Sequence, residues 1–75
     1  MSPRLPRVTA AQVIGVLEQQ GFTVARQSGS HRIYIDQHGK RVTVLYHGGR
    51  TLHPKILMSI LADAELSVDE FIRLL

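Results

Sequence analysis

The sequence contains no cysteine and no tryptophan, and only 5% of its residues are aromatic. Without thiols the chain can form neither a disulfide framework nor a cysteine-based zinc site. Its longest uninterrupted apolar run is three residues, which predicts neither a transmembrane helix nor a signal segment. We therefore expect one small cytoplasmic domain that relies on its hydrophobic core, for which 44% of the 75 residues are available.

The net charge of +3 is distributed unevenly along the chain. Residues 1–55 hold eight Lys or Arg and two acidic residues (+6), whereas residues 56–75 hold one Arg and four acidic residues (−3). All four histidines lie in the basic part. This favours a polyanion at residues 1–55, such as nucleic acid, whose phosphates bind cations and whose unpaired bases stack on tyrosines. A solvated sheet face is the alternative, because the excess between Arg26 and Lys55 is only five charges.

Capping residues and hydrophobic periodicity predict an α+β domain. Thr9 and Gln12 have the spacing of a capping box, as do Ser67 and Glu70, and Gly21 is typical of a helix end. The predicted helices cover residues 10–20, 54–63 and 67–75, and the predicted strands cover residues 22–27, 31–36 and 41–46. Residues 1–8 are predicted to form a flexible arm and residues 9–75 a single domain.

The element order α-β-β-β-α predicts a three-stranded antiparallel sheet with helices packed on one face. The apolar face, which the first helix would cover, is assigned to Phe22, Val24, Ile33, Ile35, Val42 and Val44. The more polar face is assigned to Thr23, Ala25, Arg32, Tyr34, Asp36, Arg41, Thr43 and Leu45. One side of the sheet is thus expected to be open to solvent.

His31 is the strongest candidate for chemistry, because it follows the Gly29-Ser30 turn at the start of a predicted strand. A histidine can accept or release a proton near neutral pH. RNA cleavage by its own 2′-hydroxyl needs such a base and nearby cations, and needs no metal. The candidate cations are Arg32, Lys40, Arg41 and Lys55. The structural alternative is a His31 that caps the turn or lies half-buried beside Ile33.

The other three histidines fit simpler roles. His38 lies in a glycine-containing hairpin loop and is expected to be solvated, and His53 precedes Pro54 near a helix start. His47 could contact phosphate or cap the Gly48-Gly49 turn. The four histidines are separated by seven, nine and six residues, which matches no zinc pattern. We therefore predict no metal site and no cofactor.

Several segments follow one another in a characteristic order. They are Gln20-Gly21-Phe22, Gly29-Ser30-His31, Arg41–Val44, His47-Gly48-Gly49-Arg50, Leu52, Pro54, Ile60-Leu61 and Leu66–Phe71. Over residues 9–75 this order resembles the HicA family, small toxins that act as mRNA interferases in toxin–antitoxin pairs.

The resemblance implies a fold similar to double-stranded-RNA-binding domains and a metal-independent endoribonuclease that cuts mRNA. It implies that His31 is catalytic, and that a HicB-type antitoxin covers the active face. The residues expected to contact RNA are Gly29, Ser30, Arg32, Tyr34, Lys40, Arg41, His47 and Lys55. Many relatives have glycine where this chain has Glu65, so a left-handed helix end there would cost about 1 kcal/mol more.

Three classes of function are compatible with the sequence. The first is a ribonuclease toxin with His31 as general acid or base. The second is a non-catalytic RNA-binding module on the same fold, against which the acidic C-terminal helices count. The third is a protein-interaction domain that uses the −3 C-terminal segment and Leu74-Leu75.

Overall fold

The computed structural model describes residues 4–75 as a mixed α+β fold, which confirms the predicted class. The elements are, in order, α1 (Ala10–Gln19), β1 (Thr23–Ser28), β2 (His31–Ile35), β3 (Arg41–Leu45), α2 (Pro54–Ala64) and α3 (Val68–Leu74). The first three residues of the predicted N-terminal arm lie outside the described residues. Within the rest of that segment, Val8 is buried and Leu5 packs against the core.

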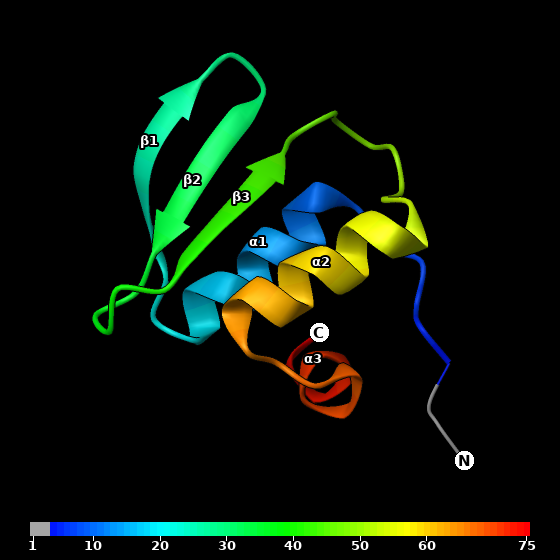
Figure 1. The fold of residues 1–75 in the computed structure, drawn as a ribbon. Coiled ribbons are helices and arrows are strands. Elements are labelled where there is room, and N and C mark those ends of the chain that lie inside the picture. The colour runs from blue at the N-terminus through cyan, green and yellow to red at the C-terminus, as the bar shows by residue number, and fades with distance from the viewer. Residues whose placement is uncertain (1–3) are drawn as a thin grey trace.

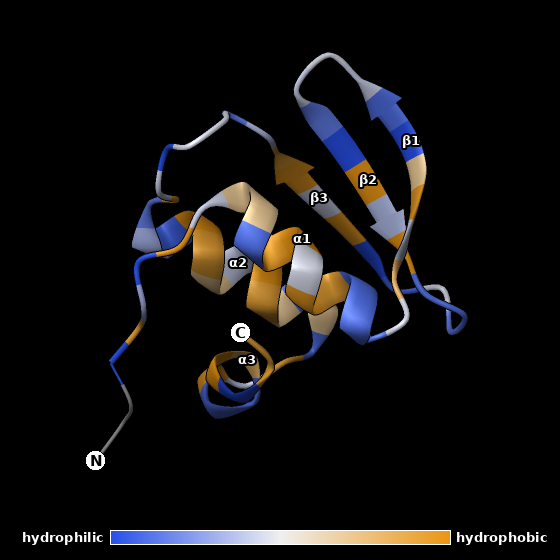
Figure 2. Ribbon diagram, turned by 180° about the vertical axis from the view of Figure 1, so that it is seen from behind, coloured by the Kyte–Doolittle hydropathy of each residue, from blue (hydrophilic) through white to orange (hydrophobic). Residues whose placement is uncertain are grey.

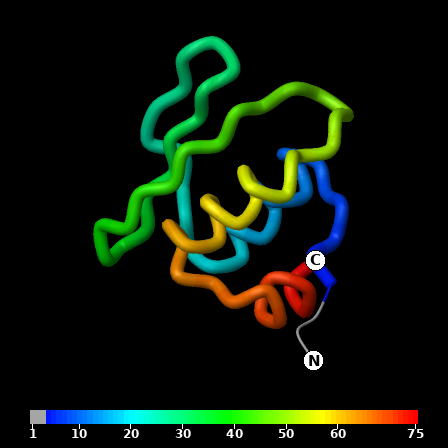
Figure 3. Tube along the Cα trace, turned by 45° about the vertical axis from the view of Figure 1, so that its right-hand side comes forward, coloured from blue at the N-terminus to red at the C-terminus, as the bar shows by residue number. Residues whose placement is uncertain are grey.

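Helices α1 and α2 lie side by side against one face of the sheet, and α3 packs on the side of this helix pair away from the sheet (Figures 1 and 3). Hydrophobic residues recur along the helices, while the end of β1 next to the β1–β2 turn is hydrophilic (Figure 2). Phe71 of α3 is fully buried, and Leu17 and Leu57 are about as deep. None of the helices described in residues 4–75 is long and apolar enough to span a membrane.

Both predicted capping boxes are present. The Thr9 backbone N–H donates to Gln12 Oε1 (2.9 Å), and the Gln12 N–H donates to Thr9 Oγ1 (3.3 Å). The Ser67 N–H donates to Glu70 Oε1 (3.0 Å), and the Glu70 N–H donates to Ser67 Oγ (3.1 Å). Hydrogen bonds from the backbone and side chain of Ser67 lower the pKa of Glu70 below its ordinary value of 4.5. Local sequence therefore defines both helix starts.

Helices α1 and α2 end in the same way. The N–H of Phe22 donates to the Leu17 carbonyl (3.0 Å), and the N–H of Leu66 donates to the Leu61 carbonyl (2.9 Å). These bonds are typical of a Schellman motif, which needs a left-handed residue just before the donor. Gly21 fills that position in α1 with φ 90°, and Glu65 fills it in α2 with φ 56° and ψ 42°.

The sheet has the strand order β1-β2-β3 with antiparallel pairing, as predicted. The face assigned to β2 is wrong, however. Tyr34 pairs with Val42 and Arg32 pairs with Val44, so Arg32 and Tyr34 face the helices. Ile33 and Ile35 lie on the open face, opposite Thr43 and Arg41.

The loop of residues 36–40 explains this register. Asp36 Oδ1 accepts from the N–H groups of His38 (3.0 Å) and Lys40 (2.8 Å), and Gly39 has a positive φ of 82°. This turn makes residue 35 pair with residue 41, so even-numbered residues of β2 face even-numbered residues of β3. In β1 the register shifts between Val24 and Arg26, and Val24 remains 51% exposed.

Candidate functional site

A groove runs along the boundary between the open side of β3 and helix α2. It consists of two adjoining pockets that share Leu45 and Ile56. The first, which we call the His31 pocket, has a volume of about 220 Å³ and is lined by His31, Thr43, Leu45, Ile56, Ser59, Ile60 and Asp63. The second, the loop pocket, has a volume of about 240 Å³ and is lined by Leu45, His47, Arg50, Thr51, Leu52, His53 and Ile56.

The turn of Gly29 and Ser30 positions His31. Ser28 pairs with His31 across this two-residue turn, and Gly29 has the positive φ (58°) that a tight hairpin requires. The N–H of Tyr46 donates to the Ser30 carbonyl (2.7 Å), which ties the turn to the end of β3. His31 is exposed and lies opposite Leu45 on the open face. Its imidazole therefore belongs to the groove and not to the core.

Helix α2 supplies the other wall of the His31 pocket. Ser59 and Asp63 are exposed residues of α2 that line it. On the sheet, Arg26 pairs with Ile33 and so lies on the same face as His31, one diagonal position away. Diagonal neighbours in a sheet are about 7–8 Å apart, within reach of a long side chain. A carboxylate, a hydroxyl and a guanidinium can therefore approach the imidazole from two elements.

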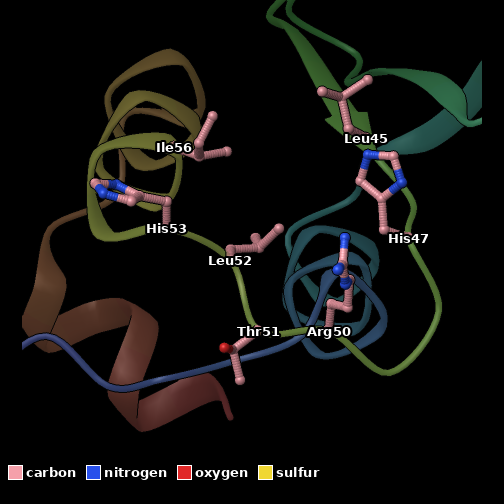
Figure 4. Close-up of a pocket in the computed structure, with 7 residues that line it drawn as sticks. All are labelled: Leu45, His47, Arg50, Thr51, Leu52, His53 and Ile56. Atoms are coloured by element: carbon pink, nitrogen blue, oxygen red, sulfur yellow. The ribbon is translucent and has the colours of Figure 1, made fainter.

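The loop of residues 46–53 forms the second pocket and arches from β3 to α2 (Figure 3). Leu45 and His47 lie on one side of this pocket, Ile56 and His53 lie on the other, and Leu52 lies between them (Figure 4). His53 caps α2, since its Nδ1 accepts from the backbone N–H of Lys55 (3.1 Å). The predicted location of His53 at the helix start is confirmed.

The structure gathers some of the predicted RNA contacts and separates others. Gly29, Ser30 and His47 lie at the same end of the sheet as His31. Lys40 and Arg41 lie at the other end: Arg41 is four strand positions from Leu45, the partner of His31, which is about 13 Å, and Lys40 precedes Arg41. Lys40 Nζ is 3.5 Å from Glu65 Oε2. Lys55 is exposed in the first turn of α2, and His38 is exposed in the hairpin loop.

Two of the predicted RNA contacts face away from the groove. Tyr34 is only 4% exposed and belongs to the core, so its ring has no free face on which a base could stack. Arg32 lies on the helix-facing side, where its Cζ is 4.1 Å from the centroid of the Tyr46 ring. Its Nε is buried and has no hydrogen-bond partner within residues 4–75. Both differences follow from the register of β2.

Sequence reasoning did not select Arg26, Arg50 or Asp63 as site residues. Arg50 stands in the segment His47–Arg50, so it had a detectable signal. Arg26 had none, because it shares the strand parity of Val24 and reaches the open face only through the register shift between these two residues. Asp63 had none, because only the packing of α2 beside β3 brings it near His31. Residues 4–75 contain no group of three or more His, Asp or Glu side chains arranged to hold a metal ion.

These features define a small α+β domain with an exposed histidine in a groove between its sheet and a helix. Residues 10–66 match the family described as HicA toxin of bacterial toxin-antitoxin systems. The match covers well over half of the chain, so the chain belongs to this family. An antitoxin partner follows from that membership. No curated protein matches the sequence.

Proposed function

We propose that the chain is a metal-independent endoribonuclease that cleaves mRNA in the cytoplasm, with His31 as general acid or base. The observation that carries the proposal is the position of His31, an exposed imidazole in a groove of a HicA-family toxin. The alternative of a His31 half-buried beside Ile33 has little support, because His31 is exposed on the open face of the sheet.

The proposed reaction uses the nucleophile that RNA itself carries. His31 removes the proton from a 2′-hydroxyl, and the 2′-oxygen forms a bond to the adjacent phosphorus. The bond between phosphorus and the 5′-oxygen breaks, and that oxygen takes up a proton from the imidazolium. The products are a 2′,3′-cyclic phosphate and a 5′-hydroxyl.

Neighbouring side chains fit supporting roles in this reaction. Arg26 lies one diagonal position from His31 on the open face, and its guanidinium can stabilise charge on the phosphate. Asp63 on the opposite wall can orient the imidazole, as a carboxylate does in other acid–base pairs. Arg32 and Tyr34 are not assigned to RNA, because both face the helices.

The antitoxin partner is proposed to be a HicB-type protein that covers the groove. The net charge of residues 1–55 is +6, so an acidic antitoxin surface would compete with RNA for this part of the chain.

The test compares the wild-type chain with His31→Ala and with His38→Ala as a matched control. Both histidines are exposed, so neither change should disturb the core. We expect His31→Ala to slow cleavage of purified mRNA in the presence of EDTA by about 10²–10⁴-fold. His38→Ala should cleave like the wild type. Equal cleavage by His31→Ala would remove the catalytic assignment, and salt-sensitive RNA binding without any cleavage would favour the non-catalytic module.

A further inference from the structure

The loop pocket has no role in the chemistry proposed at His31, yet it opens into the same groove. Leu45 and Ile56 line both pockets, and Leu45 pairs directly with His31 in the sheet. A ligand with its reacting group at His31 would therefore extend over Leu45 into the loop pocket.

The floor of the loop pocket is apolar. Ile56 is 42% exposed, and the neighbouring lining residues Leu45 and Leu52 are half-buried. A flat aromatic group could cover this surface and remove it from water.

The rim of the loop pocket consists of nitrogen donors. Arg50, His47 and His53 line it, and the described part of the chain contributes no acidic side chain to it. Because His53 Nδ1 accepts a hydrogen bond from the backbone, Nε2 is the ring nitrogen that can donate to a ligand. The edges of nucleobases and the phosphates beside them both offer acceptors to such donors.

Backbone contacts hold the side of the loop pocket formed by residues 51–53. The Leu52 N–H donates to the Val8 carbonyl (2.8 Å), and Thr51 forms a bridge with Thr9 immediately before α1. His53 also caps α2, so the last three residues of the loop are attached to the rest of the fold. A preformed pocket loses less entropy when a ligand binds.

We propose that the loop pocket binds one unpaired nucleobase of an RNA strand, next to the phosphate at His31. This inference rests on the proposed ribonuclease function and names its substrate class as single-stranded RNA. Bases in duplex RNA are stacked and paired, so they cannot enter a pocket on the protein surface. A side chain of the antitoxin is the competing occupant, but the positive charge of Arg50 and the lack of an acidic side chain among the described lining residues favour a polyanion.

The test measures binding in a His31→Ala background, where the proposed cleavage does not interfere. The probe is a 5′-labelled single-stranded RNA of mixed sequence and about ten nucleotides, and its Kd is measured by fluorescence anisotropy. Ile56→Asn is compared with Met58→Asn. Met58 lies in the same helix and is 48% exposed, but it lines neither pocket.

We expect Ile56→Asn to weaken binding about tenfold and Met58→Asn to change it by less than about twofold. The same RNA annealed to its complement should bind both variants alike. Equal Kd values of Ile56→Asn and Met58→Asn for single-stranded RNA would overturn the subsite. So would an Ile56→Asn variant that binds RNA normally but no longer binds the antitoxin. Cleavage is measured separately, with the chain that retains His31. If this chain cleaves RNA but the Kd values are equal, the subsite is rejected and the ribonuclease function is kept. If RNA binding depends on Ile56 but no cleavage occurs, the subsite is supported and the ribonuclease function is rejected.

Discussion

Replacing Glu65 by glycine is expected to stabilise the protein, because Glu65 ends α2 in the left-handed conformation (φ 56°, ψ 42°). Its position matches that of Gly21 in α1, and buried residues follow both: Phe22 after Gly21 and Leu66 after Glu65. A left-handed residue with a Cβ costs about 1–2 kcal/mol, which glycine does not incur.

Two effects oppose this gain. Glycine loses about 0.4–1 kcal/mol more backbone entropy on folding. The ion pair between Lys40 and Glu65 is also lost, but it is 3.5 Å long and the Glu65 side chain is 67% exposed. An exposed pair of this kind contributes at most a few tenths of a kcal/mol. The net expectation is a gain of about 0.5 kcal/mol, or about 2–4 °C in Tm for a domain of this size.

Glu65→Ala is the matched control, since it removes the same ion pair but keeps a Cβ in the left-handed conformation. We expect it to be slightly less stable than the wild type, and Gly21→Ala to lose about 1 kcal/mol. Urea unfolding followed by circular dichroism measures all three variants. If Glu65→Gly is no more stable than Glu65→Ala, the assignment of strain to Glu65 is refuted.

Two further predictions concern α3. Phe71→Ala should lower the free energy of unfolding by about 3–5 kcal/mol, a large part of the stability of a small domain, because Phe71 is 0% exposed. Ile72→Ala is the control: Ile72 is 38% exposed, so the loss in the same urea titration should be less than about 1 kcal/mol. Similar losses in the two variants would contradict the assignment of Phe71 to the core. Glu70→Gln tests the lowered pKa of Glu70, whose ionised form stabilises the fold above pH 4.5 and loses this effect as pH falls through the lower native pKa. The variant should therefore lose less stability than the wild type between pH about 6 and about 3, and an unchanged slope would contradict the proposed effect.

Local signals predicted most of the fold correctly. The capping boxes at Thr9 and Ser67 define their helices through contacts three residues apart, and the Asp36–Lys40 turn depends only on its own residues. Such contacts form in any context that allows the helix or turn, so they can be recognised in a sequence without knowledge of the tertiary structure.

The face of β2 could not be predicted in the same way. Ile33 and Ile35 lie on one side of the strand, and Tyr34, whose ring is also largely apolar, lies on the other. Hydropathy alone therefore favoured the side with the two isoleucines as the buried one, which is wrong. The pairing with β3 decided the question, because Val42 and Val44 are both fully buried and Tyr34 and Arg32 lie opposite them. The wall of α2 around His31 likewise depends on packing between elements distant in sequence.

The same register places Arg32, a predicted phosphate contact, on the face opposite His31. Successive strand residues point to opposite faces of a sheet. Because Arg32 contacts Tyr46 on the helix side, the preceding residue, His31, points toward the groove. A one-residue slip of β2 would reverse both, bringing the imidazole toward the core and exposing Tyr34. Burial of Tyr34 and the stacking of Arg32 on Tyr46 oppose that slip. The contact of Arg32 with Tyr46 thus adds to the 36–40 turn in favouring the register that leaves His31 on the open face.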